Sequence, residues 1–187
     1  MALQNKNIED VMMDVLRNGG VAVMPTDTIY GIVGAAFNKK TVERIYRLRK
    51  RNLKKPMIIL IGSRGDLKKF GIIITPAIKK ILNKAWPGKV SMILPCPSRR
   101  FAYLHRGSKA LAFRLPKPMW LRTVLRKTGP LVAPSANHEG LPPAHTIRAA
   151  QKYFEDNVDF YCDAGRLDSK PSMLVKLENG GLKILRR

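Results

Sequence analysis

The residues best suited to chemistry lie in three short segments of the chain. The first, Pro25–Gly31, follows an apolar stretch, Val21–Met24, whose composition predicts a short buried strand. It places two threonine hydroxyls, an aspartate and a tyrosine where that strand ends, a density of polar groups that could bind a small ligand. The same residues also suit a turn whose hydroxyl groups satisfy backbone atoms. By itself, the segment leaves both interpretations open.

The second segment is strongly basic and is a candidate phosphate site. Six of the nine residues from Arg47 to Lys55 are Lys or Arg. If this segment is extended, Arg49 and Arg51 point to the same side and could clamp phosphate oxygens with their forked guanidinium donors. The alternative is a solvated basic face with no ligand.

The third segment, Ala133–Asn137, follows a short apolar strand predicted at Leu131–Ala133. Ligand groups in α/β sheets are usually placed just beyond such strand ends. Ser135 and Asn137, two residues apart, could offer a hydroxyl and an amide to one ligand. An ordinary loop would explain the same residues.

Several familiar catalytic and binding motifs are missing. No G-x-x-x-x-G-K-[ST] phosphate loop and no G-x-G-x-x-G loop occurs, and the three histidines lack H-E-x-x-H spacing. Ser135–Asn137 is superficially similar to one motif of serine β-lactamases, but no serine has a lysine three residues later. The sequence therefore excludes covalent serine chemistry of that type and predicts no protein-held metal.

The charge of the chain points to an anionic partner. Among 187 residues, Lys and Arg number 35 and Asp and Glu 13, which gives a formal net charge of +22. Such a surface attracts nucleotides, RNA, DNA or anionic membranes, although a role in solubility alone is the alternative.

Cysteine usage and hydropathy predict a cytoplasmic protein. Cys96 and Cys162 lie far apart and have no neighbours at metal-ligand spacing, so we expect two free thiols in a reducing compartment. No apolar run is long enough for a membrane span, and the N-terminal residues do not resemble a secretory signal.

Helical and strand patterns alternate along the chain, which predicts one α/β domain with a mixed sheet over residues 7–187. Helix starts are predicted at Asn7, Thr41, Thr75 and Thr146, and a further helix at Met119–Lys127. Strands are predicted at Val21–Met24, Met57–Ile61, Val90–Leu94, Leu111–Leu115, Leu131–Ala133 and Val158–Cys162. A hairpin is predicted from Met173–Leu177 and Leu182–Leu185, with its turn at Glu178–Gly181. In the first helix, Ile8, Val11, Met12, Val15 and Leu16 follow the helical period. Pro95–Ser108 lacks a period and is interpreted as a mobile basic loop.

Six elements, in order along the chain, resemble the YrdC-like domain of threonylcarbamoyl-AMP synthases. They are Pro25–Gly31 for P-T-[DE]-T-x-Y-G, Arg49–Arg51 followed by Lys55-Pro56 for K-x-R and K-P, Trp86–Ser91 for W-P-G-x-[VL]-[TS], Arg114–Pro116 for R-x-P, Ser135–Asn137 for S-A-N, and Pro171-Ser172 for the late P-S. Each element by itself is weak evidence for the family, but six elements in the same order over nearly the whole chain are strong evidence. The short chain is most similar to the bacterial single-domain form.

The sequence departs from the family pattern at three places. Arg49 replaces the family lysine, Met173 follows the late P-S where threonine is common, and His138-Glu139 precedes Gly140. Because an ammonium is a point charge and a guanidinium a planar fork, the first change alters how a phosphate would be held.

The resemblance implies a fold and a reaction. The fold is an open twisted mixed α/β sheet with helices packed on it and a large concave basic cleft. The reaction converts L-threonine, bicarbonate or CO2, and ATP into threonylcarbamoyl-AMP and pyrophosphate for tRNA t6A37 modification. Mg²⁺ is expected with ATP, and tRNA and the t6A transferase machinery are candidate partners. The alternative is a non-catalytic RNA-binding module that uses the basic surface.

The resemblance also implies roles for individual residues. Thr26, Arg114 and Ser172 would bind threonine, and Arg49, Arg51, Ser135 and Asn137 would bind ATP. The threonine amine would capture CO2 as a carbamate, whose oxygen attacks the α-phosphorus while pyrophosphate leaves. This chemistry needs no protein nucleophile, so catalysis would rest on positioning and charge stabilisation.

Overall fold

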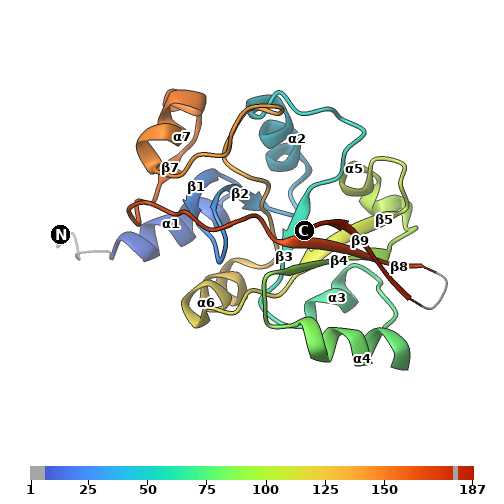
Figure 1. The fold of residues 1–187 in the computed structure, drawn as a ribbon. Coiled ribbons are helices and arrows are strands. Elements are labelled where there is room, and N and C mark those ends of the chain that lie inside the picture. The colour runs from blue at the N-terminus through green and yellow to red at the C-terminus, as the bar shows by residue number, and fades with distance from the viewer. Residues whose placement is uncertain (1–6, 179–180) are drawn as a thin grey trace, which may run out of the picture.

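A computed structural model describes residues 7–178 and 181–187. Its nine strands form one open mixed sheet in the order β7-β1-β2-β6-β3-β5-β4-β8-β9, with helices packed against it (Figure 1). The strands are β1 (Val21–Pro25), β2 (Tyr30–Ala35), β3 (Ile58–Leu60), β4 (Val90–Pro95), β5 (Ala110–Arg114), β6 (Leu131–Val132), β7 (Phe160–Tyr161), β8 (Met173–Glu178) and β9 (Gly181–Arg186). The pairs β1–β7, β3–β5 and β4–β8 are parallel and the others antiparallel, so the predicted mixed sheet is confirmed.

The helices agree largely with the sequence pattern. They are α1 (Ile8–Arg17), α2 (Lys39–Leu48), α3 (Asp66–Lys69), α4 (Pro76–Ala85), α5 (Ala102–His105), α6 (Met119–Thr128) and α7 (Ile147–Phe154), with 3-10 turns η1 (Arg99–Phe101) and η2 (Glu155–Asn157). As predicted, the side chains of Thr75 and Thr146 cap α4 and α7 by accepting backbone N–H groups at 3.3 and 3.2 Å.

The core has two parts, because residues of β1 alternate between the two sides of the sheet. Val21 and Val23 pack into a large cluster with residues of α2, α4, α5 and α7, whereas Ala22 and Met24 pack into a smaller cluster with residues of α1 and α6. Figure 1 shows α1 and α6 lying side by side. The middle strands are therefore covered on both faces, which holds their ends in fixed positions.

Several local predictions were wrong. Asn38, not Thr41, caps α2 and accepts the Thr41 N–H, because the helix begins three residues earlier than expected. Pro95–Ser108 is not a free loop: it contains η1 and α5, which bury Phe101 and Leu104 in the core. The strand β2 was not predicted.

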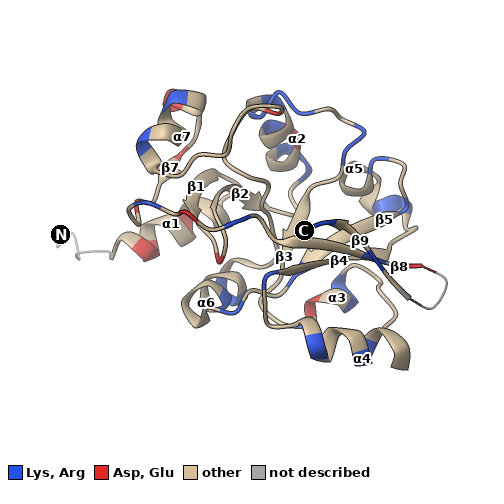
Figure 2. Cartoon of the chain, viewed as in Figure 1, with Lys and Arg blue, Asp and Glu red and all other residues tan. Residues whose placement is uncertain are grey.

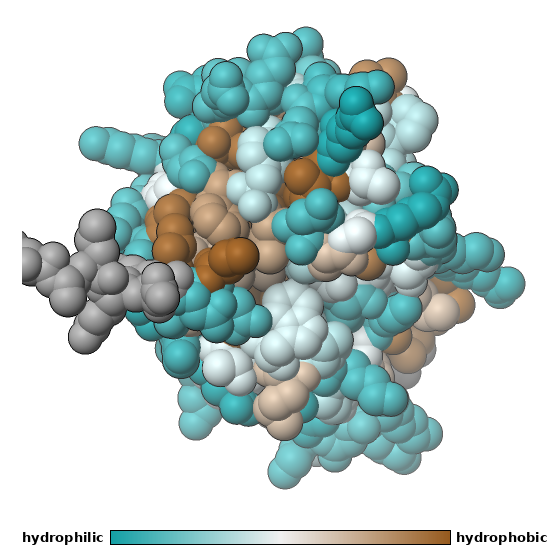
Figure 3. Space-filling model, turned by 90° about the vertical axis from the view of Figure 1, so that its left-hand side faces the viewer, coloured by the Kyte–Doolittle hydropathy of each residue, from teal (hydrophilic) through white to brown (hydrophobic). Residues whose placement is uncertain are grey.

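The N-terminal helix and the C-terminal hairpin agree with the sequence pattern only in part. Ile8 and Val11, expected on the inner face of α1, are exposed, and Met13 is buried there instead. Figure 3 shows hydrophobic side chains interrupting the otherwise hydrophilic surface on this side of the molecule.

β8 and β9 pair antiparallel as predicted, but residues 179–180 of the predicted turn lie outside the described residues. Within the described ranges, every helix is too short or too polar to span a bilayer.

Candidate functional site

A pocket of about 160 Å³ opens where several strands and one helix end. Its walls come from the β1–β2 turn, the segment after α2, the ends of β5 and β6, and the chain around β8 and β9. The lining residues are Thr26, Thr28, Ile29, Tyr30, Gly31, Arg49, Arg51, Pro56, Met57, Ile58, Arg114, Ala133, Pro134, Ser135, Pro171, Ser172, Leu174 and Arg186. The pocket thus brings together all predicted site residues except Asn137. Its volume is below the ~300–1,000 Å³ of typical ligand clefts, so the large basic cleft remains a prediction.

The threonine-rich turn joins β1 to β2, and its hydroxyls have two uses. The Thr26 hydroxyl donates to the Ile29 carbonyl oxygen at 2.7 Å and accepts the Thr28 N–H at 3.2 Å. The Thr26 and Thr28 hydroxyl oxygens lie 3.1 Å apart. Both side chains also line the pocket. The two interpretations of this segment are therefore compatible: the hydroxyls stabilise the turn and face the pocket.

Arg49 and Arg51 reach the pocket, but not from an extended segment. α2 ends at Leu48, Arg49 keeps helical backbone angles, and Lys50 has φ +48°, which turns the chain. The extended interpretation was wrong because the amphipathic pattern of α2 continues up to this turn. Arg51 donates to the carbonyl oxygens of Lys55 and Pro56 at 3.1 and 3.0 Å.

Arg49 is buried, only 3% exposed, and is held by the S-A-N segment. Its Nε donates to the Asn137 carbonyl oxygen at 3.1 Å, and its Nη2 donates to Asn137 Oδ1 at 3.1 Å and to Ser135 Oγ at 3.2 Å. Burial, and next the charge of Arg51, lower the pKa of Arg49 to about 10, so it remains a cation at neutral pH. The positive group at this wall is fixed in one orientation before any ligand binds.

Asn137 lies behind the pocket wall and does not line it. Its amide nitrogen donates to the carbonyl oxygens of His138 and Leu141, both at 2.7 Å, while its oxygen accepts from Arg49. Ser135 forms an antiparallel bridge with Gly31, near the start of β2. Of the two predicted ATP-binding residues in this segment, Ser135 lines the pocket, whereas Asn137 contacts Arg49, which lines it.

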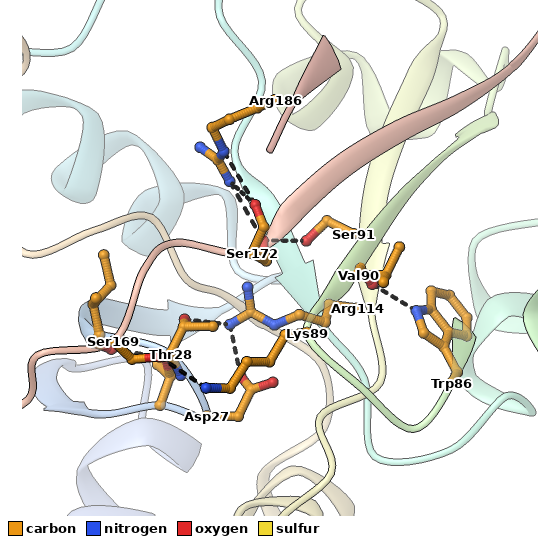
Figure 4. Close-up of polar contacts among 12 residues, drawn as sticks. Asp27, Thr28, Trp86, Lys89, Val90, Ser91, Arg114, Ser169, Ser172 and Arg186 are labelled. Atoms are coloured by element: carbon orange, nitrogen blue, oxygen red, sulfur yellow. Dashed lines mark hydrogen bonds and ion pairs between the residues drawn. The ribbon is translucent and has the colours of Figure 1, made fainter. Parts of the chain in front are cut away.

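Arg114 forms the buried floor of the pocket (Figure 4). Its Nη2 lies 2.9 Å from Asp27 Oδ1 and donates weakly to Thr28 Oγ1 at 3.5 Å. Burial outweighs the attraction of Asp27 and lowers the pKa of Arg114. Burial likewise raises the pKa of Asp27, against the opposing attraction of Arg114.

Ser172 faces Arg114 from the segment before β8. Its hydroxyl shares a 2.9 Å hydrogen bond with Ser91, and it accepts from Arg186 Nη2 at 3.3 Å. Arg186 also donates to the Ser172 carbonyl oxygen through Nε and Nη2 at 3.1 and 2.9 Å. Burial, and next the charge of Arg51, lower the pKa of Arg186.

Sequence reasoning missed Arg186, Asp27 and Ser91 as members of this site. Asp27 and Ser91 lie inside the quoted elements Pro25–Gly31 and Trp86–Ser91, so the motif order was a signal for them. Arg186 belongs to a C-terminal strand with no distinctive pattern, and only the pairing of β9 with β8 brings it to the pocket.

The Tyr30 side chain is hydrogen-bonded to the segment between β7 and β8, which carries Ser172. Its hydroxyl donates to the Gly165 carbonyl oxygen at 2.7 Å and accepts the Ala164 N–H at 2.8 Å. Further along, Lys89 donates to the Ser169 hydroxyl at 2.8 Å, as Figure 4 shows. These contacts anchor the segment between β7 and β8, which places Ser172 opposite the floor.

Basic side chains are not confined to this pocket. Figure 2 shows Lys and Arg on α2, α4, α6 and α7 and on the connections between elements. Acidic residues do not line the pocket within the described part of the chain. There is also no group of three His, Cys, Asp or Glu among the described residues that could hold a metal ion.

Comparison with known proteins places these features in a family. The family model Sua5_yciO_yrdC, described as "Telomere recombination", matches residues 14–187. A threonylcarbamoyl-AMP synthase of Methylobacillus flagellatus is 30% identical over 168 residues, covering 89% of this chain and 93% of that protein. The chain therefore belongs to the Sua5/YciO/YrdC family, which confirms the resemblance to the YrdC-like domain.

Solved structures agree on the fold. The crystal structure of P. abyssi Sua5 complexed with L-threonine matches with a TM-score of 0.87 at 25% identity, covering 96% of this chain and 53% of that one. E. coli YciO matches with a TM-score of 0.83 at 21% identity, covering 96% and 88% of the two chains. This chain spans about half the length of the P. abyssi protein and most of the E. coli protein.

Proposed function

We propose that the protein is an L-threonylcarbamoyladenylate synthase. The observation that carries this proposal is the pocket itself, in which threonine hydroxyls, the Ser172 hydroxyl and the guanidinium groups of Arg49, Arg51, Arg114 and Arg186 converge. Family membership supports it, since relatives of similar length are named for this activity. The product would supply tRNA t6A37 modification.

One side of the pocket suits an amino acid. Thr26 and Thr28 offer hydroxyls beside the backbone of the turn, and Arg114 and Ser172 offer donors to a carboxylate. The P. abyssi relative has been solved with L-threonine bound, which favours the same ligand class here. Small hydroxyls satisfy the polar groups of threonine without filling the space it needs.

The other side suits a polyphosphate. Arg49, Arg51 and Arg186 present positive charge, and Ser135 adds a hydroxyl. With no carboxylate among the described lining residues, Mg²⁺ would arrive bound to the phosphates of ATP as part of the substrate. The carbamate oxygen then attacks the α-phosphorus and pyrophosphate leaves, while the arginines stabilise the charge that develops on the phosphate oxygens.

The direct test is pyrophosphate release from ATP in the presence of bicarbonate. We expect release that requires L-threonine and falls strongly when L-valine, which lacks the hydroxyl, replaces it. Arg51→Ala should abolish most of the release, and Lys54→Ala, an exposed basic neighbour outside the pocket, should not. Release that does not depend on threonine would refute the proposal.

A non-catalytic RNA-binding module is the second candidate, and the net charge of +22 favours it. Aromatic residues make up only 7% of the chain, which is low for a protein that stacks single-stranded bases. Salt-dependent RNA binding without threonine-dependent pyrophosphate release would support this candidate over the synthase.

A further inference from the structure

Arg114 depends on a single buried carboxylate. The side chains of Arg114 and Asp27 are 4% and 1% exposed, and Arg114 Nη2 lies 2.9 Å from Asp27 Oδ1. The weak contact to Thr28 involves the same nitrogen. Both contacts thus hold one corner of the guanidinium and leave its remaining N–H groups for other partners.

The pair is incomplete in a way that points to a ligand. Arg114 Nε and both carboxylate oxygens of Asp27 are buried and have no hydrogen-bond partner in the described part of the chain. Arg114 Nη2 and Asp27 Oδ1 form an ion pair at 2.9 Å, which leaves Arg114 Nε as the buried donor without an acceptor among the described residues. A buried N–H without an acceptor is costly, and an anionic group arriving in the pocket would satisfy it.

We propose that Asp27 is a positioning residue that holds the Arg114 guanidinium ready for the carboxylate of the amino-acid substrate. Figure 4 shows the guanidinium between Asp27 and Thr28 on one side and Ser172 on the other, so a ligand beside Ser172 meets the free donors of Arg114. Asp27 itself is not among the lining residues, so it acts through Arg114. This inference rests on the proposed function, because it assigns a role within amino-acid binding.

The ion pair requires the ionised form of Asp27. Burial raises the pKa of this carboxyl, and the charges of Arg114 on β5 and of Lys89, just before β4, oppose that rise. As the pH falls through the raised pKa, Asp27 becomes neutral and no longer attracts the guanidinium. Threonine affinity should then weaken on the acid side, at pH values above the ordinary aspartate pKa of about 3.9.

The experiment measures L-threonine affinity by calorimetry and the KM values for threonine and ATP in pyrophosphate release. Asp27→Asn keeps the size of the side chain and removes its charge, whereas Asp27→Glu keeps the charge. Asp66→Asn is the matched control, because Asp66 is a buried carboxylate outside the site that accepts the N–H groups of Gly62 and Ser63, both at 3.0 Å.

We expect Asp27→Asn to weaken threonine binding and raise its KM about 10–100-fold, with the KM for ATP changed less than about 3-fold. Asp27→Glu should restore most of the affinity, and Asp66→Asn should lower stability without changing either KM. The acid-side loss of affinity should be present in the unmodified protein and in Asp27→Glu, and absent in Asp27→Asn.

The possible results separate the two proposals. If the unmodified protein binds threonine but Asp27→Asn binds it equally well, the positioning role is wrong and the proposed function stands. If the unmodified protein neither binds threonine nor releases pyrophosphate, the proposed function fails and the positioning role fails with it. Should Asp27→Asn not fold, the pH dependence of the unmodified protein decides, and threonine affinity that does not weaken on the acid side overturns the positioning role.

Discussion

Replacing Asn137 with alanine should destabilise the protein and loosen Arg49, although Asn137 does not itself line the pocket. Asn137 accepts from Arg49 Nη2 at 3.1 Å and donates to the carbonyl oxygens of His138 and Leu141, both at 2.7 Å. The alanine variant loses the charge-assisted hydrogen bond to Arg49 and leaves two carbonyl oxygens without their amide donor. Because the residue is buried, solvent cannot easily replace these partners.

The magnitude follows from these three contacts. A hydrogen bond to a charged group contributes about 1.5–3 kcal/mol and a neutral one about 0.5–1.5 kcal/mol, so Asn137→Ala should lower the free energy of unfolding by about 2.5–6 kcal/mol. For a chain of this size, that corresponds to a fall in Tm of roughly 10 °C. The variant should also weaken ATP binding, since Arg49 loses one of its anchors.

A double-mutant cycle isolates the contact between the two residues. Unfolding by urea, followed by circular dichroism, gives the stabilities of Asn137→Ala, Arg49→Ala and the double variant. We expect a coupling energy of about 1–3 kcal/mol, because both single variants break the same hydrogen bond. The backbone carbonyl of Asn137 is kept in every variant, so its bond to Arg49 Nε does not enter the difference between Asn137 and alanine. A coupling below about 0.5 kcal/mol would show that Asn137 does not hold Arg49.

The remaining predictions concern catalysis, charge and pH. Arg51→Ala should reduce adenylate formation by about 10²–10³-fold while leaving Tm within a few degrees, because in the described part of the chain its side chain donates only to the nearby carbonyl oxygens of Lys55 and Pro56. Near-normal turnover would contradict its role. Ser91→Ala should raise the KM for threonine several-fold more than the KM for ATP, since it removes the partner of a buried hydroxyl opposite Arg114, and an unchanged KM ratio would argue against this. If RNA is a partner, the affinity for tRNA should fall steeply as the salt concentration rises. The double variant Lys80→Glu, Lys84→Glu should also bind tRNA more weakly while adenylate formation is unchanged. An affinity that does not depend on salt would leave the net charge without a nucleic-acid role. Because the pKa of Asp27 is raised in the folded state, protonated Asp27 contributes stability that is fully present below its unfolded-state pKa and is lost as the pH rises through its folded-state pKa. Asp27→Asn should therefore flatten this part of the curve of unfolding free energy against pH. An unchanged curve would contradict the raised pKa.

The sequence alone determined the class of fold and most of the residues around the pocket. Alternating apolar periods of about 3.6 and 2 residues are local properties, so the helices α4, α6 and α7 and the strands β1 and β4 could be predicted from them. The order of six short elements along the chain was enough to indicate the family, which the family model confirms. The roles assigned to individual residues remain predictions.

Only the tertiary structure decided which of the predicted site residues line the pocket and which contact another site residue behind it. Arg49 and Asn137 are 88 positions apart, and their contact exists because the end of α2 packs beside the loop after β6. Asn137 therefore holds Arg49 from behind the wall, which spacing within one segment could not indicate.

The remaining differences have the same physical cause. Arg186 reaches Ser172 only because β9 pairs with β8, and Asp27 pairs with Arg114 only because the β1–β2 turn lies beside the end of β5. A local pattern records which face of an element is buried, but the partner of a buried polar group is chosen by packing between distant segments. The types of the pocket residues could therefore be predicted from the sequence, while their contacts, burial and pKa shifts depend on the fold.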